Sequence, residues 1–274
     1  MFESILKNVH EKTPLVHCIT NYVTVNDVAN ILLACGGSPI MADDEKDAVE
    51  ITSICNALVI NIGTLNERTI ATMFKTGKKA NELSHPVILD PVGAGASKLR
   101  TDTTFKLLEE VKFSIIRGNI SEIKTVYKGS GTTKGVDADI SDAVTEENLD
   151  ETISFAKELS SKTNAIIVIT GAIDIVADSN KAYVIRNGHQ MMSMVSGTGC
   201  MLTAIVAAYC AANPDNHLDA AAAAVSAFGL CGELAYEKVV KNDTGTSSYR
   251  TYLIDAMSKL DAKTLKGGMK IESR

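Results

Sequence analysis

A short run of small residues and one thiol, Ser196-Gly-Thr-Gly-Cys200, directly precedes a long apolar segment. Glycines before a helix let backbone N–H groups turn toward a ligand, and the start of a helix carries partial positive charge. The arrangement therefore suits a phosphate or a developing anion, with donors from Gly197, Thr198, Gly199 and Cys200. It matches neither a Walker A loop nor a G-x-S-x-G elbow. The alternative is a packing turn, in which small residues let another element pass closely.

Cys200 is expected in the first turn of that helix, where the positive helix end should lower the pKa of a thiol. A thiolate there could serve as a general base or as a nucleophile. Nucleophilic use normally needs a histidine base nearby, and the only histidine close in sequence is His189. The alternative is a small buried apolar side chain, the role that we expect for Cys18, Cys35, Cys55, Cys210 and Cys231.

Two further motifs carry oxygen ligands. Asp90 ends an apolar run, where a buried carboxylate is costly unless it has a partner. Asn119 and Glu122 are three residues apart after another apolar run, so they would face the same way on the first turn of a helix. Such oxygens suit Mg²⁺, which takes one or two carboxylates together with substrate phosphates. The alternatives are a structural turn at Asp90 and a capping box from Asn119 to Glu122.

Short apolar segments alternate with longer amphipathic ones over most of the chain. The pattern predicts strands at 14–20, 38–42, 57–64, 85–93, 113–119 and 165–171, and a hairpin at 174–188. It predicts helices at 25–37, 45–56, 66–83, 102–111, 145–163, 200–211, 217–240 and 246–261. The chain after Cys200 is expected to be wholly helical, and the Gly- and Thr-rich segment 128–141 is expected to be a loop.

Alternating strands and helices predict a mostly parallel sheet that is covered on both faces. Ligands of such sheets bind at the carboxyl ends of the strands. The candidate residues at or just after the carboxyl ends of the predicted strands are Asn21, Met41, Gly63, Asp90, Arg117 to Asn119, Thr170 and Gly171. We expect a single site at this edge, which the run from Ser196 to Cys200 must also reach.

Composition excludes several classes of protein. The 274 residues contain no linker-like break, so we expect one domain over 1–274. A net charge of −6 argues against a nucleic-acid surface. The N-terminus is charged throughout, unlike a signal peptide, and the apolar runs are interrupted too early for a membrane span. Six cysteines without a C-x-x-C pair indicate reduced thiols in a cytoplasmic protein.

The order of the motifs resembles the ribokinase-like superfamily of small-molecule kinases. The motifs are Asp90-Pro-Val-Gly-Ala-Gly, Arg117-Gly-Asn-x-x-Glu122, Val168-Ile-Thr-Gly-x-x-Asp174 and Gly197-x-Gly-Cys200. The superfamily usually has aspartate at the last position, where this chain has cysteine. That cysteine, with segments 17–44 and 61–65, makes the chain similar to the hydroxyethylthiazole kinase family over about residues 10 to 260.

The resemblance implies a ribokinase-like three-layer α/β/α fold with a mostly parallel sheet and no β-lid, assembled as a homotrimer with sites between subunits. It implies phosphorylation of the hydroxyl of 4-methyl-5-(2-hydroxyethyl)thiazole by ATP with Mg²⁺, in thiamine salvage. Cys200 would be the base, beside an anion hole from Gly197 to Cys200. The other implied contacts are Asn21, Met41, Gly63 and Gly197 for the thiazole, Arg117, Thr170 and Asn119 for ATP, and Glu122 and Asp90 for the metal.

Three other functions stay open from the sequence. A related salvage kinase could act on a hydroxymethylpyrimidine or a pyridoxal-type alcohol, although the Asn21 and Met41 segments favour the thiazole. A cysteine hydrolase or acyltransferase could use Cys200 as its nucleophile. A vitamin-binding protein could hold the thiazole without turning over ATP.

Overall fold

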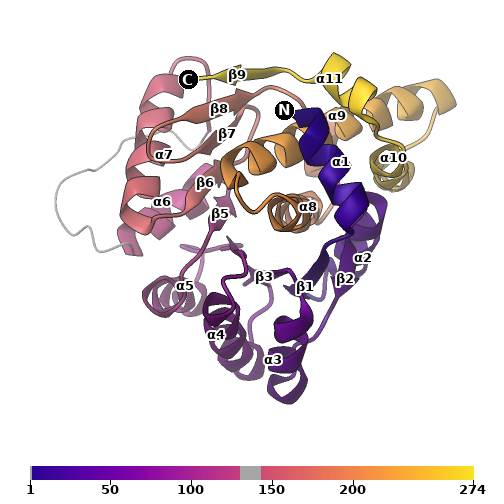
Figure 1. Cartoon of the computed structure of the whole chain (residues 1–274). Helices are drawn as coiled ribbons and strands as arrows, with labels where there is room; N and C mark the ends of the chain where they lie inside the picture. Colours follow the sequence, from indigo (N-terminus) through magenta and orange to yellow (C-terminus); the bar gives the residue numbers. More distant parts are fainter. Residues whose placement is uncertain (1, 130–142) are drawn as a thin grey trace.

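The apolar segments form one nine-stranded sheet with the strand order β2-β1-β3-β4-β5-β6-β7-β8-β9 (Figure 1). A computed structural model of the chain describes residues 2–129 and 143–274. Strands β1 to β6 are parallel, and β7, β8 and β9 each run antiparallel to the preceding strand. The strands are β1 (Leu15–Ile19), β2 (Ser38–Ile40), β3 (Ala57–Asn61), β4 (Val87–Asp90), β5 (Ile115–Gly118), β6 (Ile166–Ile169), β7 (Asp174–Ala177), β8 (Ala182–Ile185) and β9 (Ile271–Ser273).

Helices cover both faces of the sheet because its central strands are apolar on both sides. One layer consists of α1 (Phe2–Lys12), α2 (Val25–Ala34), α8 (Thr198–Ala212), α9 (His217–Asn242), α10 (Thr246–Ser258) and α11 (Ala262–Gly268). The other layer consists of α3 (Glu45–Ile54), α4 (Glu67–Glu82), α5 (Lys98–Glu110), α6 (Ile120–Gly129) and α7 (Leu149–Thr163). The three-layer α/β/α architecture predicted from the sequence is confirmed (Figure 1). Every named strand belongs to the one sheet, so the described residues contain no separate β-lid.

The strand order reverses at β1, which lies between β2 and β3. The chain leaves β1 toward β2 by way of α2 on one face, and returns through α3 on the other face to form β3. Such a reversal opens a crevice beyond the carboxyl ends of the two strands, where ligands of α/β sheets bind. Helix α8 packs across β1, β3 and β4, so its start can meet this crevice.

Helix α9 is a core helix. Residues 219–232 are all buried, because α9 lies between the sheet, α8 and α10. Alanine, glycine, serine and cysteine fill most of this stretch and let the neighbouring elements approach closely. Of the described helices, α9 is the one whose length and apolar content would suffice to cross a membrane, and most of its apolar stretch is buried inside the protein. A buried core helix has the same composition, so this finding favours a core role.

The structure differs from two expectations of the sequence, and a third lies mostly outside the described residues. The chain after Cys200 is not wholly helical, because residues 271–273 form β9 and pair with the otherwise open edge of β8. Helix α5 begins at Lys98 rather than 102, because the Ser97 hydroxyl accepts a hydrogen bond from the N–H of Arg100. Most of the predicted loop 128–141 lies outside the described residues, which resume at 143.

Tyr209 provides a stability test of this core. It is fully buried on α8, and its hydroxyl has no hydrogen-bond partner among the described residues. Removing an unsatisfied buried hydroxyl should be favourable. We expect Tyr209→Phe to raise the free energy of unfolding, measured by urea denaturation, by about 1 kcal/mol.

Tyr249→Phe is the matched control. Tyr249 is equally buried, but its hydroxyl donates to the carbonyl of Gly232 at 3.0 Å. Its removal should lower the free energy of unfolding by about 1 to 2 kcal/mol. Equal destabilisation by both substitutions would contradict the assignment of an unpaired hydroxyl to Tyr209.

Candidate active site

The first turn of α8 presents unpaired backbone donors at the sheet edge. Gly197 precedes the helix with φ +88°, and its carbonyl accepts the N–H of Met201 at 2.8 Å. The three N–H groups between them, on Thr198, Gly199 and Cys200, therefore have no acceptor within the helix. No side chain caps this end. Three donors and the positive helix end thus remain available to an anion.

The two glycines of this turn are required by two close contacts. A Cβ on Gly197 would lie 2.6 Å from Cγ2 of Thr24, and the positive φ there already disfavours any other residue. A Cβ on Gly199 would lie 2.5 Å from Nη1 of Arg117. The start of α8 therefore touches the loop after β1 on one side and the end of β5 on the other. The two interpretations of this turn from the sequence, close packing and ligand binding, are therefore compatible.

Two asparagine side chains donate hydrogen bonds to the thiol of Cys200. The Nδ2 atoms of Asn21, after β1, and of Asn61, at the end of β3, each lie 3.3 Å from Sγ. Backbone groups fix the orientation of both amides. Oδ1 of Asn21 accepts the N–H of Thr24 at 3.2 Å, and Oδ1 of Asn61 accepts the N–H of Gly63 at 2.9 Å. Both nitrogens must then face the sulfur, where they would stabilise a negative charge.

The prediction of a lowered thiol pKa for Cys200 is wrong. Burial raises the pKa of this thiol, and the nearby charge of Asp90 raises it further. Hydrogen bonds from Thr24, Asn21 and Asn61 act in the opposite direction but do not overcome burial. The sequence indicated the helix start but could not indicate that Cys200 would be only 9% exposed. The resting side chain is therefore a neutral thiol at neutral pH.

Asp90 is a fully buried carboxylate at the end of β4. Its Oδ2 accepts hydrogen bonds of 2.8 Å from Nδ2 of Asn61 and from the hydroxyl of Thr203 on α8. Its Oδ1 has no hydrogen bond within the described part of the chain and lies 3.6 Å from Nη1 of Arg117. Burial raises the pKa of Asp90 to about 6, although Arg117 and the two hydrogen bonds lower it. Asp90 thus joins the thiol group to Arg117.

Arg117 lies between Asp90 and Thr170, beside the start of α8. Its Nη2 donates to the hydroxyl of Thr170, after β6, at 2.6 Å. Its Nε is buried without a hydrogen-bond partner among the described residues. The guanidinium therefore retains donor capacity beside the free N–H groups of α8, which is the combination that phosphate recognition uses.

Asn119 and Glu122 form the capping box that was one of the two interpretations. The N–H of Glu122 donates to Oδ1 of Asn119, and the N–H of Asn119 donates to Oε2 of Glu122, both at 2.9 Å. Oε1 of Glu122 also accepts the N–H of Gly93 at 2.9 Å. This bond connects the turn after β4 to the start of α6. Carboxylate oxygens have further lone pairs, so the capping role does not exclude a ligand.

The oxygen ligands near Glu122 are too few to enclose a metal ion on their own. Among residues 2–129 and 143–274, no three His, Cys, Asp or Glu side chains are grouped as a metal cage. Glu122 and the unpaired Oδ1 of Asp90 both offer hard oxygens. This set suits Mg²⁺ held mainly by water and phosphate oxygens, as that ion commonly is.

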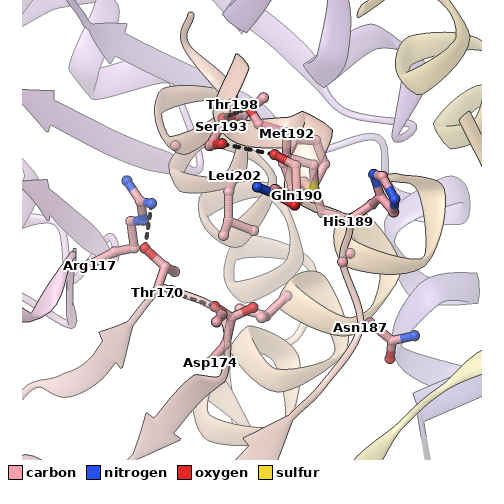
Figure 2. Close-up of a pocket in the computed structure, with 17 residues that line it drawn as sticks. Arg117, Thr170, Asp174, Asn187, His189, Gln190, Met192, Ser193, Thr198 and Leu202 are labelled. Atoms are coloured by element: carbon pink, nitrogen blue, oxygen red, sulfur yellow. Dashed lines mark hydrogen bonds between the residues drawn. The ribbon is translucent and has the colours of Figure 1, made fainter. Parts of the chain in front are cut away.

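A cavity of about 630 Å³ opens on the Arg117 side of the α8 start (Figure 2). Its walls come from β5, the loop after β6, the segment 187–193, α8 and α9. Thr198 and Gly199 of the turn line it, together with Arg117 and Thr170. Asn119 and Thr170 also line a neighbouring hollow of about 330 Å³. The residues that line the large cavity are Arg117, Thr170, Gly171, Ala172, Asp174, Asn187, Gly188, His189, Gln190, Met192, Ser193, Thr198, Gly199, Leu202, Val225, Phe228 and Gly229.

The residues singled out from the sequence therefore form two connected groups. Asn21, Gly63, Gly197 and Cys200 gather at the ends of β1 and β3, and Gly63 packs directly against Asn21. The second group lines or adjoins the cavity and consists of Arg117, Thr170, Asn119, Thr198 and Gly199. Asp90 connects the two groups, and Glu122 caps α6 beside them.

Met41 is the most separate of these residues. It follows β2 at the same sheet edge and is half-buried against the hydrophobic core. His17 steadies this segment, because its Nε2 pairs with the carbonyl of Ala42 at 2.8 Å and its Nδ1 with the hydroxyl of Thr52 at 2.9 Å. His17 is thus a structural histidine.

Sequence reasoning missed Asn61, Thr24 and Thr203, which hold the thiol and Asp90. Asn61 lies inside the predicted strand 57–64, whereas β3 ends at Asn61, so the available signal was one polar side chain within an apolar run. The structure gives the cysteine hydrolase interpretation no histidine base for Cys200 among the described residues. His189 stacks on Tyr236, with ring centroids 3.5 Å apart, and its Nδ1 accepts the N–H of Met191. Within the described residues, no histidine is hydrogen-bonded to Cys200.

Comparisons with known proteins agree on one family. A model of the Hydroxyethylthiazole kinase family matches residues 6–263. A hydroxyethylthiazole kinase of Clostridium acetobutylicum is 61% identical over 273 residues, which cover 100% of both chains. One of Clostridium beijerinckii is 53% identical and covers 98% of this chain and 96% of its own.

Solved structures agree with this fold. The hydroxyethylthiazole kinase protein of Pyrococcus horikoshii superposes with a TM-score of 0.89 at 33% identity, covering 100% of this chain and 98% of its own. Pyridoxal kinase of Staphylococcus aureus in complex with ADP gives a TM-score of 0.58 at 14% identity, covering 80% of this chain and 87% of its own. The second likeness extends to the fold alone.

Gly199→Ala tests whether the close approach of Arg117 to α8 matters for anion binding. The added methyl would lie 2.5 Å from Nη1 and should displace the guanidinium, which is the flexible partner. We expect the dissociation constant for ATP, used as a polyphosphate probe in calorimetry, to rise about tenfold through loss of charged hydrogen bonds.

Gly267→Ala is the control, because a Cβ there would meet no atom within 4 Å. It should leave ATP affinity unchanged and slightly favour the helix α11. Equal ATP affinities for Gly199→Ala and the unchanged protein would contradict this role of the contact.

Proposed function

Because the chain belongs to the hydroxyethylthiazole kinase family, we propose that it transfers the γ-phosphoryl group of ATP to the hydroxyl of 4-methyl-5-(2-hydroxyethyl)thiazole, in thiamine salvage. One structural observation supports this proposal independently of family membership. The free N–H groups at the start of α8 lie between a 630 Å³ cavity and a buried thiol. A transferring phosphoryl group needs a donor on one side, an acceptor on the other and positive charge between them.

ATP occupies the 630 Å³ cavity, with its phosphates toward the start of α8. Arg117, Thr170 and the N–H groups of Thr198 and Gly199 supply charge and hydrogen bonds there. Asn119 borders the adjoining hollow. These groups are preorganised by contacts that the protein already makes, so little reorganisation accompanies the reaction. The N–H groups from Gly197 to Cys200 act as the anion hole for the γ-phosphoryl oxygens.

The thiazole alcohol binds on the Cys200 side. Asn21, Gly63 and Gly197 bound this region, and Met41 follows the adjacent strand β2. A thioether packs favourably against a flat aromatic ring, which supports the assignment of Met41 to the thiazole. Magnesium, held by Glu122 and the charge of Asp90 together with phosphate oxygens, would neutralise charge on the phosphates.

Cys200 accepts the proton of the substrate hydroxyl while the new O–P bond forms and ADP leaves. In a loose transition state the hydroxyl needs little earlier deprotonation, so a modest base suffices. Burial keeps the thiol neutral at rest, so only its small ionised fraction can serve. The two amide donors at 3.3 Å stabilise that thiolate.

The assembly is a homotrimer in the cytoplasm, with each thiazole site completed by a second copy of the chain. Tyr22 and Val23 follow β1 beside Asn21 and are 79% and 61% exposed. Two large apolar side chains exposed at the site edge support a protein contact there. Reduced cysteines support the cytoplasm.

The functional test is ADP release by the purified protein with ATP and Mg²⁺, with either hydroxyethylthiazole or hydroxymethylpyrimidine as the alcohol. We expect turnover with the thiazole only. Turnover with the pyrimidine alone would retain the kinase and change its substrate. Absence of ATP use with both alcohols would refute the kinase proposal.

Substitution of Cys200 tests its role as base. Cys200→Ser should lower kcat roughly 10²-fold, because a neutral hydroxyl is a far poorer base. Cys200→Asp should keep substantial activity, because Asn21 and Asn61 already direct donors at this position. In the unchanged protein, kcat should increase about tenfold per pH unit below the raised thiol pKa, and less steeply in Cys200→Asp.

Cys35→Ser is the control, because the buried Cys35 thiol donates to the carbonyl of Leu32 and a hydroxyl can do the same. It should leave kcat and its pH dependence unchanged. A folded Cys200→Asp protein without activity would contradict the assignment of the base.

A further inference from the structure

Asp174 is the one acidic side chain among the described residues that line the 630 Å³ cavity. It begins β7, and its Oδ1 accepts the N–H of Gly171 at 2.9 Å. That bond fixes the carboxylate at the cavity wall (Figure 2). Its Oδ2 makes no hydrogen bond with any described residue, so one strong acceptor stays available to a ligand.

The other polar side chains of the cavity are mostly engaged elsewhere. The hydroxyls of Ser193 and Thr198 donate to backbone carbonyls of Gln190 and Met192. The amide of Asn187 is held by the carbonyl of Gly268, the carboxylate of Glu233 and the N–H of Lys270. Among the described lining side chains, those that keep an unused nitrogen or oxygen for a ligand are Arg117, Asp174, His189 and Gln190.

Different parts of the cavity wall differ in chemistry. Arg117, Thr170 and the start of α8 make one end cationic and rich in donors. Leu202, Val225 and Phe228 make another part apolar. A nucleotide would place its phosphates at the first and its base against the second. The sugar must then lie between them.

Asp174 lies next to the phosphate end, where the sugar would follow the phosphates. Figure 2 shows it on the cavity wall beside Thr170, with Asn187 on the far side of the cavity. Its carboxylate is close enough to Arg117 for the two charges to interact. A carboxylate repels phosphate oxygens but accepts hydrogen bonds well from hydroxyl groups. The sugar hydroxyls are the donors of a nucleotide that fit this position.

We propose that Asp174 accepts a hydrogen bond from a ribose hydroxyl of the bound nucleotide and thereby selects ribonucleotides over deoxyribonucleotides. This inference rests on the proposed use of ATP. It assigns a direct contact to the last residue of the Val168-Ile-Thr-Gly-x-x-Asp174 motif.

The ionisation of Asp174 is consistent with an acceptor that awaits a donor. Burial raises the pKa of its carboxyl to about 7, while the Gly171 N–H and the charge of Arg117 lower it. A hydroxyl donor would favour the ionised form further. The contact is therefore best measured at about pH 8, above that pKa.

The experiment compares kcat/KM for ATP, 2′-deoxy-ATP, 3′-deoxy-ATP and 2′,3′-dideoxy-ATP, with hydroxyethylthiazole as the acceptor. The unchanged protein should prefer ATP at least about tenfold over the analogue that lacks the bonded hydroxyl, because hydrogen bonds to charged groups are strong. Asp174→Ala should reduce this preference to within about twofold, since neither oxygen remains.

Asp174→Asn separates the contact from the turn. An asparagine Oδ1 can still accept the N–H of Gly171, so the turn should persist while the charge-assisted bond to ribose is lost. Its preference for ATP should be intermediate. Gln190→Ala is the control, because it removes another unpaired side chain of the same cavity. It should keep the full preference for ribose, whatever its effect on KM.

The outcomes are distinguishable. No discrimination by the unchanged protein, or discrimination that persists in Asp174→Ala, would overturn the ribose contact. Equal losses of kcat/KM for all four nucleotides in Asp174→Ala would also overturn it, since Asp174 would then support only the turn. Absence of turnover with every nucleotide would instead refute the kinase proposal.

Discussion

The site depends on one close contact, between the first turn of α8 and the carboxyl edge of the sheet. Gly197 and Gly199 allow this turn to touch Thr24 on one side and Arg117 on the other. Any larger residue would move the helix away from the edge or displace one of these partners. The contact brings three unpaired N–H groups to the reversal of strand order and divides the edge into a thiol side and a cavity side. An acceptor and a donor of a phosphoryl group could meet across it.

A buried charge network maintains this arrangement at a cost in stability. Asp90 is fully buried, and its raised pKa means that the folded protein favours its protonated form more than the unfolded chain does. Ionised Asp90 therefore lowers stability as the pH rises from the ordinary carboxyl range to about 6. Arg117, Asn61 and Thr203 reduce this penalty without removing it. A buried carboxylate with such a cost is expected where the position of a charge serves chemistry.

Much of the fold was predictable, because the strands are short runs of buried β-branched residues and the helices between them are amphipathic. The sheet edge that holds the site followed from the parallel order alone. The sequence could not indicate which distant residues would lie close together in space. Asn61 looked like one more strand residue until β1 placed Asn21 beside it, and β9 pairs with β8 from a segment about 85 residues later.

The pKa of the Cys200 thiol could not be predicted from the sequence for the same reason. The predicted helix start at residue 200 is close to the observed start at Thr198, but the pKa of Cys200 depends on burial among residues from β1, β3 and β4, which no local pattern reports. The family assignment succeeded for a different reason. It rested on the order of several motifs along nearly the whole chain, so an error in one position could not change it.

The most direct test of the account is a crystal structure with a non-hydrolysable ATP analogue, Mg²⁺ and hydroxyethylthiazole. We expect γ-phosphate oxygens within hydrogen-bond distance of the N–H groups of Gly199 and Cys200, and the thiazole hydroxyl between that phosphate and Sγ of Cys200. A nucleotide bound away from the start of α8, or a thiazole hydroxyl directed away from Cys200, would contradict it.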